Sequence, residues 1–201
     1  MHCYYQNIYL INNNQPKQTI NKINNEKINF FNDDCHIINQ KGELIKFELY
    51  TFQEELLKQF ETHKENIINK ARQLDISSLL SNYALYKILN NDNYNVVIIT
   101  PNLQLSKHMK ELLYNNYDNM NQIKLITNTI EKFHLDNNSH IHFYYTKHQI
   151  EDYIGRNDKI DLLIIDEAIS LKHSMAHFID NSVFNMCERV IIASTNWFYD
   201  K

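Results

Sequence analysis

A short apolar stretch that ends in two carboxylates, Asp161–Ala168, constrains this chain more than any other feature. It reads Asp-Leu-Leu-Ile-Ile-Asp-Glu-Ala, so four apolar residues run directly into Asp166 and Glu167. An unbroken apolar run of this length is typical of a strand buried on both faces of a parallel sheet flanked by helices. Ligands of such sheets bind beyond the carboxyl ends of the strands. The stretch therefore predicts a buried strand with two acids at a ligand-binding edge. The alternative is a buried strand that meets solvent at two charges.

Strands alternate with helices over most of the remaining chain. Strands are predicted at Asn66–Asn69, Tyr94–Thr100, Ile123–Ile126 and Arg189–Ser194, and helices at 52–63, 77–89, 103–117, 149–154 and 171–186. Two further segments, Ile130–Leu135 and His140–Tyr145, flank the turn Asp136–Ser139 and predict a β-hairpin. This alternation predicts an α/β fold with a mostly parallel sheet, helices on both faces and a small hairpin insertion.

The first 45 residues are expected to form a partly irregular extension that precedes the main domain at 46–201. Within it, Tyr4–Ile11 suits a strand, and the Asn-rich segment Asn12–Asn29 suits a loop. Cys35–Ile38 and Leu44–Phe47 flank Gly42 and predict a small hairpin.

Composition excludes several classes of protein. The net charge of −4 argues against a strongly basic surface with which this chain alone would bind nucleic acid. The three cysteines are widely spaced and form no C-x-x-C pair, which indicates a reduced, intracellular protein. No apolar run approaches the roughly 18 residues of a membrane span, and the amino terminus lacks the pattern of a signal peptide.

A strand, a loop and a helix follow one another at 66–89, which is the arrangement that binds phosphates. When the phosphate-loop pattern G-x-x-x-x-G-K-[ST] is laid over residues 70–77, only Ser77 fits, because Lys70, Asp75 and Ile76 replace the glycines and the lysine. Lys70 and Arg72 nevertheless bring two cations to the loop, unless they are ordinary surface charges. The hydroxyl of Ser77, at the helix start, suits Mg²⁺.

Several motifs, taken in order, resemble the large terminase subunits of tailed bacteriophages, the motors that package DNA. The resemblance covers roughly residues 40–201 and has five parts: Phe47–Gln53 before the first helix, the variant phosphate loop Lys70–Ser77, the acidic strand Ile164–Ala168, the coupling motif Ala193–Trp197, and the hairpin turn with Gly155-Arg156. It implies a P-loop NTPase-like fold.

The resemblance also implies roles for individual residues. Glu167 would orient and deprotonate the attacking water, and Arg72 would stabilise the transferring phosphate. Ser77 and Asp166 would hold Mg²⁺. ATP would be bound by Gln53, which reads adenine, and by Lys70, Arg72, Gln73, Ser77 and Ser78. The motif Ser194-Thr195-Asn196 would couple hydrolysis to movement.

The implied function is the ATPase motor of a DNA-packaging terminase, which drives double-stranded DNA through a ring of identical subunits. Its partners would be the portal, the small terminase subunit and a separate nuclease chain, because no nuclease domain follows in this sequence. The expected location is the cytoplasm of the host cell, with no membrane association.

Three departures from the family pattern keep a second hypothesis open, a terminase-like nucleotide-binding or assembly module that does not hydrolyse ATP. Asp75 replaces a loop glycine, and its carboxylate would repel phosphates or occupy the anion site by capping the helix at Ser77 and Ser78. Asn196 follows Thr195 without a proline, and the nuclease domain is absent. A helicase-type ATPase shares the acidic strand but would need a second motor domain.

Two smaller alternatives concern single residues. Gln53 lies in an amphipathic helix, where a solvent-face residue is the favoured interpretation, because a single Gln specifies little. The histidines at 134, 140 and 142 lie on facing strands of the predicted hairpin, where a solvated face is favoured over a zinc site.

Overall fold

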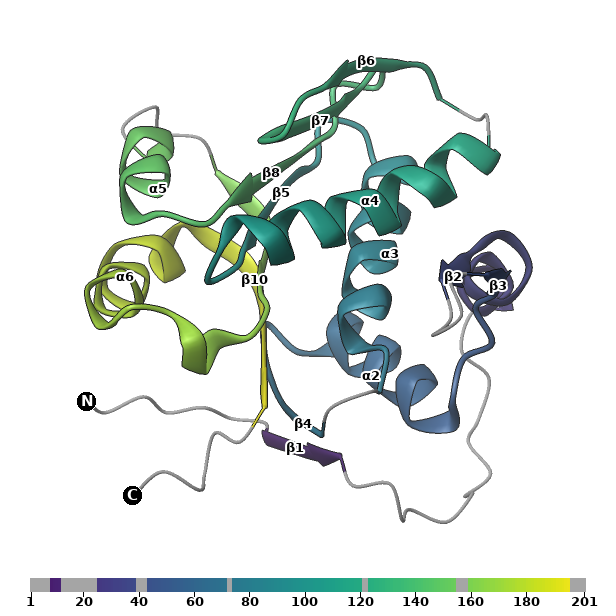
Figure 1. Ribbon diagram of the computed structural model, residues 1–201, viewed down its shortest axis with the longest axis horizontal. Helices are drawn as coiled ribbons and strands as arrows, with labels where there is room; N and C mark the ends of the chain where they lie inside the picture. Colours follow the sequence, from purple (N-terminus) through teal and green to yellow (C-terminus); the bar gives the residue numbers. More distant parts are fainter. Residues whose placement is uncertain are drawn as a thin grey trace.

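A mixed eight-stranded sheet organises the part of the chain that the computed structural model describes, residues 8–11, 25–38, 43–71, 74–120, 123–154 and 159–195 (Figure 1). The strand order is β1-β4-β10-β9-β5-β8-β7-β6. The first six strands are parallel, and β7 and β6 extend the sheet in antiparallel fashion. The strands are β1 (Ile8–Ile11), β4 (Glu65–Lys70), β5 (Asn95–Ile99), β6 (Leu125–Asn128), β7 (Lys132–Leu135), β8 (His140–Tyr144), β9 (Ile160–Ile165) and β10 (Cys187–Thr195).

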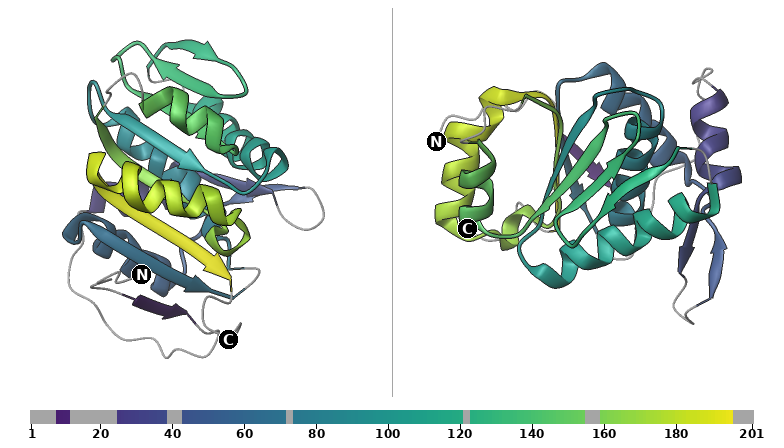
Figure 2. Two further views of the ribbon diagram at one scale, coloured as in Figure 1. Left: turned by 90° about the vertical axis from the view of Figure 1, so that its left-hand side faces the viewer. Right: turned by 90° about the horizontal axis from the view of Figure 1, so that it is seen from above.

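Helices cover both faces of this sheet (Figure 2). One face carries α2 (Thr51–Thr62), α3 (Ile76–Leu89) and α4 (Leu103–Met120), and the other carries α5 (Lys147–Ile154) and α6 (His173–Phe178). A two-stranded sheet of β2 (His36–Ile38) and β3 (Leu44–Lys46) packs beside α4. Within the described residues, no helix combines the length and apolar character needed to cross a bilayer.

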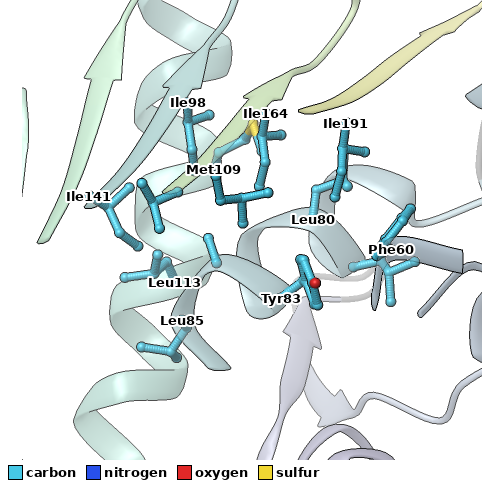
Figure 3. Close-up of a cluster of buried hydrophobic side chains, with 14 of the residues drawn as sticks. Phe60, Leu80, Tyr83, Leu85, Ile98, Met109, Leu113, Ile141, Ile164 and Ile191 are labelled. Carbon is cyan, nitrogen blue, oxygen red and sulfur yellow. The ribbon is translucent and has the colours of Figure 1, made fainter. Parts of the chain in front are cut away.

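Alternate residues of the buried strands supply two separate cores. In β9, Leu162 and Ile164 pack under α2, α3 and α4, whereas Leu163 and Ile165 pack under α6. Figure 3 shows the larger core, in which Met109 lies beside the strand residues Ile98 and Ile164, and Tyr83 lies beside Phe60. A strand with helices on both faces needs apolar residues at every position, which explains the continuous run in the sequence.

Most predicted elements are confirmed within one to three residues, including the parallel sheet, the four helical segments up to residue 154 and both hairpins. Strand β8 of the larger hairpin also pairs with β5, so the hairpin belongs to the main sheet. Strand β1 confirms the described part of the expected strand at Tyr4–Ile11. The proposed domain boundary at residue 45 stays a prediction, although Phe31 and Cys35 pack into the larger core.

Strand β6 confirms the strand expected at Ile123–Ile126, two residues further along the chain. Two local predictions are wrong. Residues Asn25–Asn29 form helix α1 rather than a loop, and a π-helical turn, Phe30–Asp34, follows it and anchors in the core. The single helix expected at 171–186 is instead α6 followed by a π-helical turn, Ile179–Val183, and a 3₁₀ turn, Phe184–Met186.

Met175, Ile179 and Val183 are buried and lie four residues apart, so they share one face of this helical segment. Confirming their predicted role, Met175, Phe178 and Phe184 pack in the second core, and Cys187 is buried there.

A half-buried ion cluster ties helix α2 to its neighbours around Glu61. Its carboxylate lies 2.6 Å from the Lys27 ammonium, 3.5 Å from Lys87 and 3.7 Å from Arg189. The Tyr83 hydroxyl donates to it at 3.0 Å. Burial alone would raise the pKa of Glu61, but the hydrogen bond from Lys27 and the nearby charges lower it below its ordinary value of 4.5.

Replacing Glu61 with Gln is expected to lower the free energy of unfolding by about 2 kcal/mol at pH 7, because three cations then share no counter-charge. Urea unfolding measures the loss. Glu55→Gln, an exposed change on the same helix, is the control and should cost under about 0.5 kcal/mol.

The Glu61 penalty should also depend on pH. Because the folded-state pKa of Glu61 is lowered, its contribution is present above about pH 4.5 and is lost as the pH falls through the folded value. The difference between wild type and Glu61→Gln should therefore shrink below pH 4.5. A difference that stays constant down to pH 3 would contradict this account.

Candidate functional site

The carboxyl ends of three adjacent strands bring the predicted loop and acids together. Strand β10 lies between β4 and β9, with Thr195 opposite Lys70 in one pairing and Ile192 opposite Ile165 in the other. Because all three strands are parallel, their last residues lie at one edge of the sheet. Lys70 and Asp166 therefore meet there, although 96 residues separate them in the sequence.

Lys70 is the centre of a buried polar cluster at this edge. Its ammonium nitrogen lies 2.6 Å from Asp166 Oδ1 and 3.1 Å from Glu167 Oε1, and it donates to Ser77 Oγ at 3.4 Å. The Ser77 hydroxyl donates to Asp166 Oδ2 at 2.5 Å. Asp166 is fully buried and Lys70 is 7% exposed. One cation and two carboxylates leave the cluster with a net negative charge, which suits a further cation.

Glu167 is held in a specific and unfavourable backbone conformation. Its φ of 52° lies in the left-handed region, which costs a non-glycine residue about 1–2 kcal/mol. Its carboxylate is fixed by Lys70 on one oxygen and by the Thr195 hydroxyl, which donates to the other at 3.0 Å. Such strain often accompanies a functional side chain whose direction matters.

Ser194 fixes the turn that follows the two acids. Its hydroxyl oxygen accepts a hydrogen bond from the Ile169 backbone N–H at 3.1 Å, and Ser194 is fully buried. Thr195 and Ser194 thus connect the end of β10 to Glu167 and to the turn that follows it. The two predicted coupling residues that the structure describes therefore contact the acid turn directly.

Asp75 occupies a backbone position typical of glycine. Its φ of 51° and ψ of 28° are left-handed, and its side chain makes no capping hydrogen bond to helix α3. The expectation that its carboxylate caps the N–H groups of Ser77 and Ser78 is therefore wrong, because a side-chain cap needs an extended backbone at that residue. Burial raises the pKa of Asp75, so the charged carboxylate is disfavoured there.

Gln53 is fully buried, so the alternative of a solvent-face residue is wrong. Its amide oxygen accepts from the Tyr50 N–H at 3.0 Å, and its amide nitrogen donates to the Leu74 carbonyl at 3.0 Å. Gln53 therefore fastens the start of α2 to the phosphate-type loop. The first of these bonds is the Gln53 half of a capping box, and the sequence did not reveal it, because Tyr50 stands where that pattern has Ser or Thr.

Gln53→Ala is expected to destabilise the protein by about 2–3 kcal/mol, because it leaves a cavity and two buried backbone groups without partners. Thermal or urea unfolding measures the loss. Glu55→Ala, exposed on the same helix, is the matched control and should change stability by under about 0.5 kcal/mol. Equal losses of stability in Gln53→Ala and Glu55→Ala would show that the hydrogen bonds of Gln53 do not stabilise the protein.

Several other predicted residues cannot be placed relative to this cluster, because they fall outside the described part of the chain. Arg72, Gln73 and Asn196 lie outside the described residues, as do Gly155-Arg156 and Trp197. Ser78 is buried in α3, and none of the described hydrogen bonds links it to the acids. The His140 ring lies beside the rings of His134 and His142. Among the described residues, no set of three or more His, Cys, Asp or Glu side chains is arranged to hold a metal.

The lysine at the end of β4, the serine at the start of α3, two acids after β9 and the polar end of β10 thus meet at one edge of a mostly parallel sheet in an α/β fold. No protein-family model matches the chain, and no curated protein matches it in sequence. Solved structures do match, and the chain has the fold of the ATPase domain of phage large terminases.

Three of these structures show the extent of the likeness. A mutant ATPase domain of the large terminase from Thermus phage P74-26 has a TM-score of 0.61 at 14% identity, over 76% of this chain and 69% of that one. The HK97 bacteriophage large terminase has a TM-score of 0.63 at 14% identity, over 84% and 36%. The large terminase of a thermophilic bacteriophage, in complex with ADP, has a TM-score of 0.53 at 9% identity, over 73% and 38%. The match thus spans little more than a third of the last two large terminases.

Proposed function

We propose that this chain is the ATPase motor domain of a phage DNA-packaging terminase, which couples ATP hydrolysis to the translocation of double-stranded DNA. The observation that carries the proposal is the cluster of Lys70, Ser77, Asp166 and Glu167 at one sheet edge. The similar terminase of the thermophilic bacteriophage was solved in complex with ADP, which supports a nucleotide as ligand.

The cluster offers the oxygen donors that Mg²⁺ prefers. Mg²⁺ binds through one or two protein oxygens, phosphate oxygens and waters, and the Ser77 hydroxyl and the Asp166 carboxylate fit this requirement. When bound, the ion would neutralise charge that develops on the phosphates. Lys70 already contacts both donors, so on binding of the ion its ammonium would leave them and pair with phosphate oxygens.

Glu167 is the group proposed to activate the attacking water. Its carboxylate would accept a proton from the water, and the Thr195 hydroxyl bond keeps it oriented. Ser194 and Thr195, together with Asn196, would respond to the phosphate state because the first two already contact the acid turn. Gln53 would read adenine, and Arg72, Gln73 and Ser78 would contact the phosphates.

The whole motor requires more than this chain. By likeness to the phage large terminases, we propose a homo-oligomeric ring in the host cytoplasm, with the portal, the small terminase subunit and a separate nuclease chain as partners. A nuclease assay on the packaging complex reconstituted with and without a candidate nuclease chain tests the last of these.

A second candidate is a terminase-like nucleotide-binding or assembly module that does not hydrolyse ATP. Asp75 favours it, because partial burial raises the pKa of its carboxyl group, which lies beside the helix start where phosphates would bind. Two charges about 4 Å apart repel by roughly 4 kcal/mol at an effective dielectric of 20. Even if Mg²⁺ or a nearby cation screened part of this repulsion between Asp75 and a phosphate, the loss of affinity for ATP would be large.

The Asp75→Gly variant separates the two candidates. Glycine accepts the observed left-handed φ without strain and removes the carboxylate. If Asp75 blocks the loop, calorimetry should show Mg²⁺-ATP affinity at least about tenfold higher in the variant, a change of about 1.4 kcal/mol. If the loop is already competent, wild type should bind and hydrolyse Mg²⁺-ATP, and the affinity should change by less than about threefold. Absence of binding in both proteins would contradict both candidates.

A further inference from the structure

The side-chain amide of Gln53 joins helix α2 to the two residues that precede α3, Leu74 and Asp75, here called the loop end. The amide oxygen accepts a hydrogen bond from the Tyr50 N–H, and the amide nitrogen donates one to the Leu74 carbonyl, each at 3.0 Å. Because the Gln53 side chain is fully buried, a ligand can reach the amide only if one of these neighbours moves. In this structure Gln53 therefore holds the loop end and not a base.

The two backbone groups bound to Gln53 present the same pair of hydrogen-bonding atoms as adenine. A glutamine amide pairs with adenine by accepting from the N6 amino group and donating to N7. Here the Tyr50 N–H stands in for the amino group, and the Leu74 carbonyl stands in for N7. Guanine cannot take their place, because it offers acceptors at both O6 and N7.

The backbone of the loop end is strained directly after Leu74. Asp75 has a φ of 51° and lies at the start of helix α3. A left-handed conformation is unfavourable for a residue other than glycine and persists only where surrounding contacts maintain it. The bond from Gln53 to Leu74 is one such contact, so its loss should let the loop end leave this conformation.

We propose that Gln53 is a switch that makes the conformation of the loop end depend on adenine. Without nucleotide, its amide binds Leu74 and keeps Asp75 in the strained conformation. When adenine takes the amide, Leu74 is released, and the loop end rearranges around the phosphates. The switch rests on the proposed function, because it takes ATP as the ligand and Gln53 as the residue that reads adenine; it adds control of the loop end by the base.

Binding of a triphosphate that has no base tests the switch in the full chain. Gln53→Met keeps the approximate volume of the side chain but cannot donate to Leu74, so the loop end is released in every molecule. Calorimetry should show that inorganic tripolyphosphate with Mg²⁺ binds about three- to tenfold more tightly to Gln53→Met than to wild type, the usual effect of one hydrogen bond. A purely structural tether predicts the opposite, because the variant would then disorder the phosphate site.

Mg²⁺-ATP and a second variant provide the controls. Mg²⁺-ATP should bind Gln53→Met no more tightly than wild type, because the variant also loses its contacts with adenine. Glu55→Met, an exposed change on the same helix, should bind tripolyphosphate and ATP as wild type does.

A measurement on wild type keeps the test valid if Gln53→Met fails to fold. Millimolar adenosine should speed amide hydrogen exchange in the first turn of α3, Ile76–Leu79, because release of Leu74 loosens the residues that precede it. Guanosine should leave the exchange unchanged, since it cannot replace Leu74 on the amide.

Two results would overturn the switch and leave the proposed function intact. The first is tripolyphosphate that binds Gln53→Met no more tightly than wild type, although wild type binds Mg²⁺-ATP. The second is an equal effect of adenosine and guanosine on the exchange. If wild type binds neither Mg²⁺-ATP nor tripolyphosphate, the proposed function fails and the switch fails with it.

Discussion

Glu167→Gln is expected to lower the rate of Mg²⁺-ATP hydrolysis by about 10²–10⁴-fold, the usual contribution of a positioned general base. The amide keeps the size of the side chain and can still accept from the Thr195 hydroxyl, but it no longer takes a proton from water. Binding of Mg²⁺-ATP should change by less than about threefold, because the proposed phosphate and metal contacts come from Lys70, Ser77 and Asp166. Steady-state phosphate release and calorimetry measure the two effects.

The matched control for this variant is Glu65→Gln. Glu65 is exposed at the opposite end of β4, the strand that leads to Lys70. It should retain wild-type hydrolysis within about twofold. A Glu167→Gln protein that hydrolyses ATP as fast as this control would exclude Glu167 as the base. No hydrolysis by wild type, supplied with DNA and partner subunits, would favour the non-hydrolysing module.

Lys70→Met is expected to destabilise the protein by about 3–5 kcal/mol at neutral pH, because it leaves a fully buried Asp166 without its cation. Methionine approximates the length of the lysine stem, so the loss reflects the missing charge rather than a cavity. Urea unfolding at pH 7 measures it. Lys64→Met, an exposed change near the start of β4, is the control and should cost under about 0.5 kcal/mol.

A double variant shows whether charge is the cause. Adding Asp166→Asn to Lys70→Met removes both members of the pair and should recover most of the lost stability, since a neutral amide is less costly to bury than an unpaired carboxylate. Millimolar Mg²⁺ should also stabilise Lys70→Met, but not the double variant, if Asp166 and Ser77 bind the ion. If the double variant is instead less stable than Lys70→Met, the unpaired charge of Asp166 is not the cause of the destabilisation.

The sequence was most informative where local pattern and final environment agree. The apolar run Leu162–Ile165 is buried on both faces, so the strand and its acids were predictable from neighbouring residues alone. Lys70 and Ser77 were also predictable, because a strand, a loop and a helix follow one another there. Prediction failed at 25–29 and 171–186, two segments whose buried residues, such as Phe31 and Met175, pack against parts of the chain far away in the sequence.

The capping role expected of Asp75 was wrong, and the burial of Gln53 was not predictable, for a related reason. Asp is a favoured helix cap when its backbone is extended, and only the packed loop imposes the left-handed conformation that excludes this role. Gln53 was ambiguous on an amphipathic helix. Its burial depends on the Leu74 carbonyl, which lies 21 residues away in the sequence.

By itself, the sequence determined the order of strands and helices and the charged residues at the strand ends, because hydrophobic periodicity and chain direction are local properties. Tertiary structure alone decided that β10 lies between β4 and β9, which sets Thr195 against Glu167 and Lys70 against Asp166. The physical reason is that strand order and the strained backbone at Asp75 and Glu167 depend on contacts between segments far apart in the chain.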